Sequence, residues 1–181
     1  RKILLLAALL STSVFAQSQN GLGISQFDNN GKLIFPDNID RWIVMGAGLG
    51  SDYAEEAFNA ENPGIIGVVQ MEPTAYDFFL TNGQYADGTM FYLTFYNSEI
   101  KSEPQVQGFV QGDVGGREIH LIDKSRYIDG RAFFMFNVEQ QQASTALPPG
   151  NDCVVCHNQH GQFDGTFTQF YPAMRAHIAE K

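Results

Sequence analysis

Cys153-Val154-Val155-Cys156-His157, near the C-terminal end of the chain, is its most informative segment. This C-x-x-C-H spacing is typical of covalent haem attachment. Two thiols three positions apart, on one turn of backbone, can add to the two vinyl groups of a single porphyrin. The histidine that follows the second thiol then lies beneath the ring, where its imidazole can bind the iron. Cys153 and Cys156 are the only cysteines in the chain, so no other pair competes for this role.

Three other roles for the two cysteines are a structural disulfide, a thioredoxin-like redox pair and half of a zinc site. A redox pair of that kind lies near the start of a βαβ unit, which the sequence does not indicate here. A zinc site needs four ligands, and only His160 is a further candidate close in sequence. The motif therefore favours one covalently bound haem c.

The first residues have the features of an export signal. Two basic residues precede an apolar run (3–10), and residues 14–16 offer small side chains for cleavage, so residues 1–16 are predicted to be a signal peptide. The run is too short to span a bilayer, and nothing later approaches about twenty apolar residues. A periplasmic location follows, where bacteria attach haem c and where free thiols would otherwise form a disulfide. Residues 17–181 are enough for a single domain with a substantial core.

The chain is acidic, with 11 Lys and Arg against 20 Asp and Glu and a formal net charge of −9. Removal of the signal peptide takes away Arg1 and Lys2, which makes the balance more negative. Nucleic acid and anionic membranes are poor partners for such a chain. A basic electron-carrier protein is a better one.

The pattern of apolar residues predicts an α+β fold: a curved, mainly antiparallel β-sheet with flanking helices, closed on one face by the C-terminal haem-binding segment. Turn residues separate the candidate elements. The predicted strands are 64–71, 89–96, 106–110, 117–122 and 131–138. Helical segments are expected at 36–42, 51–60, 73–83, one turn around the haem motif, and about 168–180.

Four segments resemble the cytochrome P-460 and cytochrome c′-beta family, in the same order along the chain. They are Asp40-Arg41-Trp42-Ile43-Val44-Met45-Gly46, Asp87-Gly88-Thr89, the C-x-x-C-H motif and Phe167-Thr168-Gln169-Phe170-Tyr171-Pro172. The resemblance covers nearly all of residues 17–181. It implies a periplasmic, mainly β homodimer that carries one high-spin haem with a single protein axial ligand.

The resemblance also points to one deciding position. Cytochromes P-460 carry a lysine, in the strand after the Asp-Gly-Thr turn, that bonds to the porphyrin edge and supports hydroxylamine oxidation. An ungapped count from Asp87 places Leu93 at that position, with Phe91 and Phe95 on the same strand face. Leucine cannot form that bond, and the nearest lysine, Lys101, is eight residues away. The departure favours the c′-beta branch, whose apolar distal pockets bind nitric oxide and similar diatomic ligands.

His157 is the predicted iron ligand, and its other ring nitrogen is expected to donate to a carbonyl or carboxylate. No sixth ligand stands out. Four methionines lie in apolar segments where core packing is the default, and Met174 lies on the packing face of the last predicted helix. His120 is either near the haem or an ordinary strand histidine, and His160 and His177 are expected at the surface. The four core methionines are Met45, Met71, Met90 and Met135.

Two interpretations of Glu118 have equal support from the sequence. In the first, which the resemblance implies, it faces the haem and accepts a proton during catalysis; in the second, it is an exposed strand glutamate. Arg41, Arg126 and Arg131 are candidates to pair with haem propionates, because a guanidinium group matches a carboxylate in two hydrogen bonds. The resemblance also suggests that the loop with Gly161 and Asp164 borders the distal side.

Three functions follow from these features. The first is a five-coordinate haem protein that binds nitric oxide or a similar diatomic ligand. The second is an enzyme that oxidises hydroxylamine or nitric oxide and passes electrons to a carrier. The third, less favoured because no ligand methionine stands out, is simple electron transfer by a six-coordinate iron.

Overall fold

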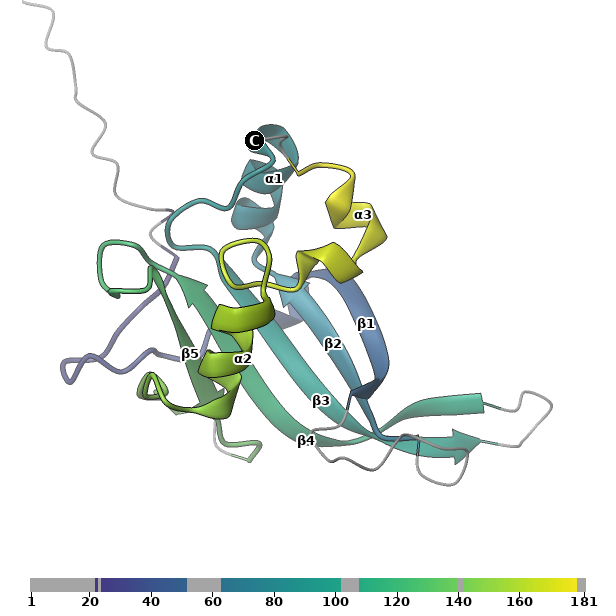
Figure 1. Ribbon diagram of the computed structural model, residues 1–181. Coiled ribbons are helices and arrows are strands. Elements are labelled where there is room, and N and C mark those ends of the chain that lie inside the picture. The colour runs from purple at the N-terminus through teal and green to yellow at the C-terminus, as the bar shows by residue number, and fades with distance from the viewer. Residues whose placement is uncertain (1–21, 23, 52–62, 102–107, 140–141, 179–181) are drawn as a thin grey trace, which may run out of the picture.

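Five antiparallel strands form one sheet in sequence order, in a computed structural model that describes residues 22, 24–51, 63–101, 108–139 and 142–178. This arrangement, with helices on the sheet, confirms the predicted α+β class with an antiparallel sheet (Figure 1). The predicted signal peptide lies outside the described residues. The strands are β1 (Ile43–Ser51), β2 (Ile65–Met71), β3 (Met90–Lys101), β4 (Gly108–Ile122) and β5 (Arg131–Phe136).

Side chains alternate between the two faces of this sheet. On β4, Ile119 and Leu121 are fully buried in an aromatic core on one face, which we call the core face. Segments from the N-terminal part, including Leu33, Phe35 and Trp42, pack on this face. Glu118 and His120 point to the opposite face. Alternate residues of β4 therefore point into the core on one face of the sheet and toward the opposite face.

Three helices lie on the opposite face: α1 (Pro73–Asn82), α2 (Asp152–His160) and α3 (Pro172–Arg175) (Figure 1). Helix α1 begins with proline at its first turn, where the Glu72 side chain accepts a hydrogen bond from Ala75 N at 2.9 Å. It ends at Gly83, whose φ of 64° is the left-handed conformation that glycine adopts without strain. Phe79 of α1 packs on Tyr85 and belongs to a second core cluster with Phe91 and Met174.

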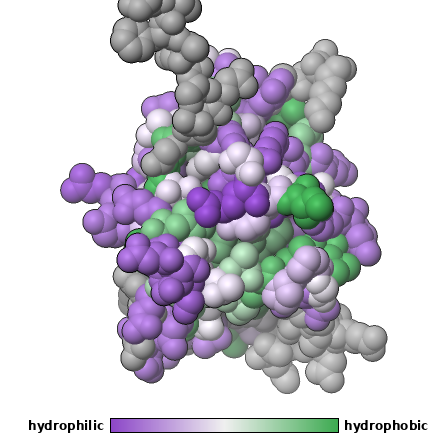
Figure 2. All heavy atoms as spheres, turned by 90° about the vertical axis from the view of Figure 1, so that its left-hand side faces the viewer, coloured by the Kyte–Doolittle hydropathy of each residue, from purple (hydrophilic) through white to green (hydrophobic). Residues whose placement is uncertain are grey.

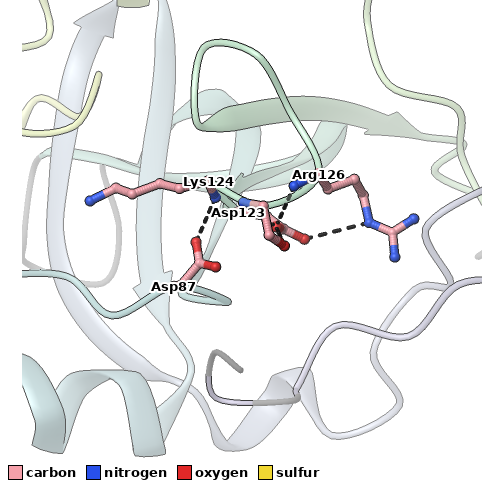
Figure 3. A network of polar contacts seen from close by, with 5 residues as sticks. Asp87, Asp123, Lys124 and Arg126 are labelled. Atoms are coloured by element: carbon pink, nitrogen blue, oxygen red, sulfur yellow. Dashed lines mark hydrogen bonds and ion pairs between the residues drawn. The ribbon is translucent and has the colours of Figure 1, made fainter. Parts of the chain in front are cut away.

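The Asp87-Gly88-Thr89 turn joins the start of β3 to the loop after β4. Gly88 N donates to Ile122 O at 2.7 Å, and the Asp87 carboxylate accepts from Lys124 N at 2.6 Å. Figure 3 shows this contact beside the Asp123 carboxylate, which accepts from the amide of Arg126 in the same loop. This turn therefore has a structural role: it fixes the loop between β4 and β5.

The glycine-rich strands differ from the prediction. No strand was predicted at β1, which contains three glycines, and β4 was predicted as two strands, 106–110 and 117–122. Glycine weakens intrinsic strand propensity, but pairing along neighbouring strands compensates for it: β1 pairs along β2, and β4 pairs along β3 through register shifts near Tyr96. Strand β3 is correspondingly longer than predicted.

The helical predictions need two corrections. The segment predicted as one helix at 168–180 is a 3-10 turn, η2 (Thr168–Phe170), followed by α3, because Pro172 has no amide hydrogen and starts a new helix. The haem motif lies in a nine-residue helix, α2, and not in a single turn. The first helical segment is shorter than predicted, η1 (Ile39–Arg41), and the helix predicted at 51–60 lies mostly outside the described residues.

One face of the molecule is mostly polar (Figure 2). Figure 2 shows hydrophilic side chains, in purple, around smaller white and green areas on the side that is to the left in Figure 1. None of the helices in the described part of the chain has the length and apolar character needed to cross a membrane.

Candidate haem site

Helix α2 presents the motif to a cavity of about 310 Å³. The Asn151 side chain caps this helix by accepting a hydrogen bond from Cys153 N at 3.0 Å. Cys153 and Cys156, three residues apart on the helix, line the cavity together with His157. The cysteines are not joined in a disulfide. Both thiols and the imidazole therefore face one space.

The other walls of this cavity come from the sheet and from the segment after α2. Strands β1 to β4 supply apolar side chains and glycines, together with two titratable groups. The segment after α2 supplies two threonines and three aromatic rings. The lining residues outside α2 are Met45, Gly48, Gly67, Val69, Phe91, Leu93, Phe95, Glu118, His120, Thr166, Phe167, Thr168, Phe170 and Tyr171.

The His157 ring is oriented by a hydrogen bond from Nδ1 to Gly165 O, at 2.6 Å. Since a carbonyl oxygen only accepts, Nδ1 carries the hydrogen and Nε2 is left with a free lone pair. Phe133 and Phe167 pack on the ring, with centroid distances of 4.6 and 4.7 Å. Burial lowers the pKa of His157 below its usual value, against the opposite effect of the Gly165 bond. A neutral, fixed imidazole with a free Nε2 is what an iron ligand requires.

Leu93 lies at the centre of the sheet wall. It is opposite Val69 of β2 and opposite Glu118 of β4. Phe91 and Phe95 line the same wall two residues to either side. Burial raises the pKa of Glu118 to about 7, because its charged form loses contact with water and no cation compensates. The wall is thus hydrocarbon with one carboxyl group that ionises near neutral pH.

Tyr85, Thr168 and Thr166 form a buried chain of hydroxyl groups at another wall. Thr166 donates its hydrogen to Phe163 O at 2.7 Å, so Thr168 donates to Thr166 and Tyr85 donates to Thr168. Burial raises the pKa of Tyr85 to about 12, which keeps its hydrogen in place. Each hydroxyl hydrogen is used within the protein, so this chain has none to donate to a molecule in the cavity.

His120 lies in the cavity wall, beside His157, with 5.5 Å between ring centroids. Phe133 packs on both rings, at 4.3 Å from His120 and 4.6 Å from His157. The two imidazoles thus lie side by side, both packed against Phe133. His120 is 8% exposed, its Nε2 has no hydrogen-bond partner among the described residues, and burial lowers its pKa well below the usual value. It is a neutral packing residue in this structure.

The arginines lie away from the cavity lining. Arg41 is exposed at the end of η1. Arg126 packs over the Phe27 ring at 3.9 Å and pairs with Asp123. Arg131 donates from Nε to Asn158 Oδ1 at 3.0 Å. Pairing of Arg41 or Arg131 with haem propionates stays a prediction.

Of the five methionines, only Met45 lines the cavity. Met71, Met90 and Met174 are buried in the two core clusters, and Met135 is half exposed. His160 and His177 are exposed, and Asp164 pairs with Lys124 at the surface. Within the described residues no group of three or more His, Cys, Asp and Glu side chains converges, so they do not provide the ligand set of a zinc site.

Comparison with known protein families gives a match over residues 41–168 to the model of cytochrome P460. The chain belongs to the cytochrome P460 family. The match includes all five strands, helix α2 and the C-x-x-C-H motif, and family membership implies a haem cofactor. A search of curated proteins found no match.

The cavity of this cytochrome P460 family member suits a haem in two independent ways. The first is its donor set: two thiols and an imidazole with a free Nε2 on one side of the space. The second is Phe170, which lines the cavity yet is 69% exposed and stacks on Phe167 with an angle of 6° between the rings. A planar cofactor would cover such an exposed ring and bury its apolar surface.

Sequence reasoning missed part of the lining. Thr168, Phe170 and Tyr171 belong to the Phe-Thr-x-Phe-Tyr-Pro segment, which supported the family resemblance but received no site role. The Tyr171 ring packs on Gly46, where a Cβ atom would lie 2.1 Å from the ring. The shared family motif was the signal that could have found these residues.

Proposed function

We propose that this protein carries one haem covalently on Cys153 and Cys156, with His157 as the iron ligand, and that its open iron side binds nitric oxide or a similar neutral diatomic molecule. The observation that carries this proposal is that the three motif residues and the hydrocarbon wall around Leu93 line the same cavity. Ferrous haem iron supplies the electrons for binding such ligands.

The wall composition supports neutral ligands over anions. Leu93, Phe91 and Phe95 offer no hydrogen bond, and the Tyr85 chain has no hydrogen to donate. An anion beside this hydrocarbon wall loses its hydration without compensation from the wall. Nitric oxide, which is small and uncharged, loses little hydration free energy when it enters.

One observation favours the second function, oxidation of hydroxylamine or nitric oxide. Glu118 lies in the cavity wall with a pKa of about 7, and a general base works best when its pKa is near the working pH. The nitric oxide proposal ranks first because no lysine lines the cavity in the described part of the chain. The family resemblance also matches Leu93 to the cross-linking lysine of cytochromes P-460.

The absorption spectrum of the purified ferrous protein, before and after addition of nitric oxide, tests these functions. We expect a high-spin, five-coordinate iron that binds nitric oxide, together with slow or absent hydroxylamine oxidation. A low-spin, six-coordinate spectrum in both oxidation states would favour simple electron transfer. Rapid hydroxylamine oxidation that is lost in Glu118→Gln would favour the enzyme.

The attachment residues are tested separately. The double variant Cys153→Ala with Cys156→Ala should lose covalent haem, because both thioether bonds start there. His157→Ala should keep some attached haem but change the ferrous and ferric spectra. Haem on the denatured double variant, or unchanged spectra in His157→Ala, would show that haem or iron is held elsewhere.

The family resemblance also supports a periplasmic homodimer. Fractionation of the source cells and the mass of the native haem protein by light scattering test these two points.

A further inference from the structure

Arg131, the first residue of β5, contacts both chain segments that hold the proximal histidine. Its Nε donates to Asn158 Oδ1 at 3.0 Å, and Asn158 follows His157 directly in α2. Its side chain also packs on Gly165, so closely that a Cβ atom on Gly165 would lie 2.6 Å from Arg131 Nε. Gly165 provides the carbonyl that accepts from His157.

The loop that holds this carbonyl is tightly folded. Gly165 has φ of 72°, and Asp164 before it has φ of 49°, which is uncommon for a residue with a side chain. A Cβ atom on Gly161 would lie 2.4 Å from the backbone of Gly165, so the two glycines pack directly together. Lys124 Nζ, from the loop before β5, lies 3.7 Å from the Asp164 carboxylate. The β4–β5 loop and Arg131 thus support this loop from one side.

We propose that Arg131 is a positioning residue for the iron ligand: by joining α2 to the 161–165 loop, it fixes the hydrogen bond from His157 Nδ1 to Gly165 O. This inference rests on the proposed ligation of haem iron by His157. A strong bond at Nδ1 makes the imidazole a better donor to iron, which strengthens the iron–histidine bond and stabilises the ferric state. Arg131 then acts on the proximal side through its Nε contact.

If Arg131 acted only through its positive charge, its loss would change the reduction potential in a different direction. A positive charge near the iron stabilises the ferrous state, so its removal lowers the reduction potential. Loss of the hydrogen-bond geometry raises the potential and weakens the iron–histidine bond. The two effects on the potential therefore have opposite signs, and variants that separate geometry from charge distinguish them.

The experiment compares three variants of the haem-loaded protein by the ferrous iron–histidine stretching frequency and the reduction potential. Arg131→Lys keeps the charge but loses the planar contact. Asn158→Ala removes only the acceptor of Arg131, at an exposed helix position where alanine favours the helix. Both should lower the frequency and raise the potential. Arg131→Gln should lower the frequency equally, with a potential below that of Arg131→Lys.

Arg126→Gln is the matched control. It removes the same charge from the neighbouring loop, and Arg126 faces Phe27 and Asp123 instead of the histidine. The iron–histidine stretching frequency of Arg126→Gln should equal that of the wild-type protein. Wild-type frequencies in both Arg131→Lys and Asn158→Ala would overturn the inference, since Arg131 would then act through charge alone. Unchanged spectra in His157→Ala would instead overturn the proposed function, so the two failures are distinguishable.

Discussion

In the proposed function, the choice of chemistry depends on Leu93. It supplies only hydrocarbon at the centre of the sheet wall, opposite Val69 and Glu118. A porphyrin cross-link needs a nucleophilic amine there. We therefore expect the denatured haem protein to have the mass of polypeptide plus one haem, and the proteolytic peptide from Thr89 to Lys101 to be free of haem. Mass spectrometry of the intact protein and its peptides measures both.

The engineered variant Leu93→Lys provides the comparison. Burial favours the neutral form of a lysine at this position, and that form is the nucleophile needed for attack. A fraction of the variant is expected to cross-link under peroxide. A haem-bearing peptide from outside Cys153 to His157 in the wild-type protein would contradict the match of Leu93 to the cross-linking position. Oxidation of hydroxylamine or nitric oxide would then be favoured over nitric oxide binding.

Glu118 should make stability depend on pH. Its pKa is about 7 in the folded chain, against 4.5 without burial, so the folded state holds the proton over a range where the unfolded chain has lost it. The resulting stabilisation is complete below about pH 4.5 and is lost as pH rises through 7. The neighbouring His120 does not offset this, because burial lowers its pKa and keeps it uncharged, and a Cys153 joined to haem as a thioether has no proton to lose.

Glu118→Gln should therefore raise the free energy of unfolding at pH 8, by up to about 3 kcal/mol, and change it little at pH 4.5. Urea unfolding at the two pH values measures the difference. Glu99→Gln, at the exposed end of β3, is the control and should change the free energy of unfolding little at either pH value. An equal effect of Glu118→Gln at both pH values would show that the carboxyl group is not protonated in the folded protein.

At the scale of elements, helix α2 depends on its cap. The Asn151 side chain accepts a hydrogen bond from the amide of Cys153 itself, so the cap fixes the first residue of the proposed attachment site. Asn151→Ala should lower the free energy of unfolding by about 1 kcal/mol. Asn151→Asp keeps the acceptor and should retain the stability. Chemical unfolding of the haem-loaded variants measures this, and equal losses in both would show that the cap does not contribute.

The sequence predicted elements well where side chains dominate. Strands β2 and β5 and helix α1 have clear apolar patterns and terminal signals, and they occur as expected. The prediction failed at β1 and in the middle of β4, where glycines interrupt the pattern of apolar residues. These glycines are Gly46, Gly48, Gly115 and Gly116. Those strands exist because partners pair with them, and pairing between distant segments is not visible in local propensity.

In the candidate haem site, too, the sequence predicts what depends on side-chain pattern and misses what depends on contacts between distant segments. Alternation placed Phe91, Leu93 and Phe95 on one face, and placed Glu118 with His120. The Gly165 carbonyl and the Arg131 contact depend on how a loop folds against β5, which no local pattern encodes.

At the scale of the whole molecule, the negative charge should control association. If the partner is the basic electron carrier that we propose, a formal net charge of −9 attracts it over a distance set by the salt concentration. The association rate constant with a basic carrier protein should fall steeply as ionic strength rises from about 10 mM to about 150 mM. Stopped-flow mixing measures this, with an acidic carrier as control. A rate that does not depend on salt would argue against electrostatic attraction.

The alternation of side chains along β3 and β4 has a consequence for how this fold can be altered. Cavity residues such as Leu93 and Glu118 are separated from core residues such as Tyr92 and Ile119 by a single position, yet they occupy opposite faces. A combinatorial library at Leu93 and Glu118 can therefore change ligand preference while the contacts on the core face are kept. One inserted residue would instead exchange the faces of all that follow in the strand. On this sheet new chemistry arises by substitution, whereas a change of length destroys core and site together.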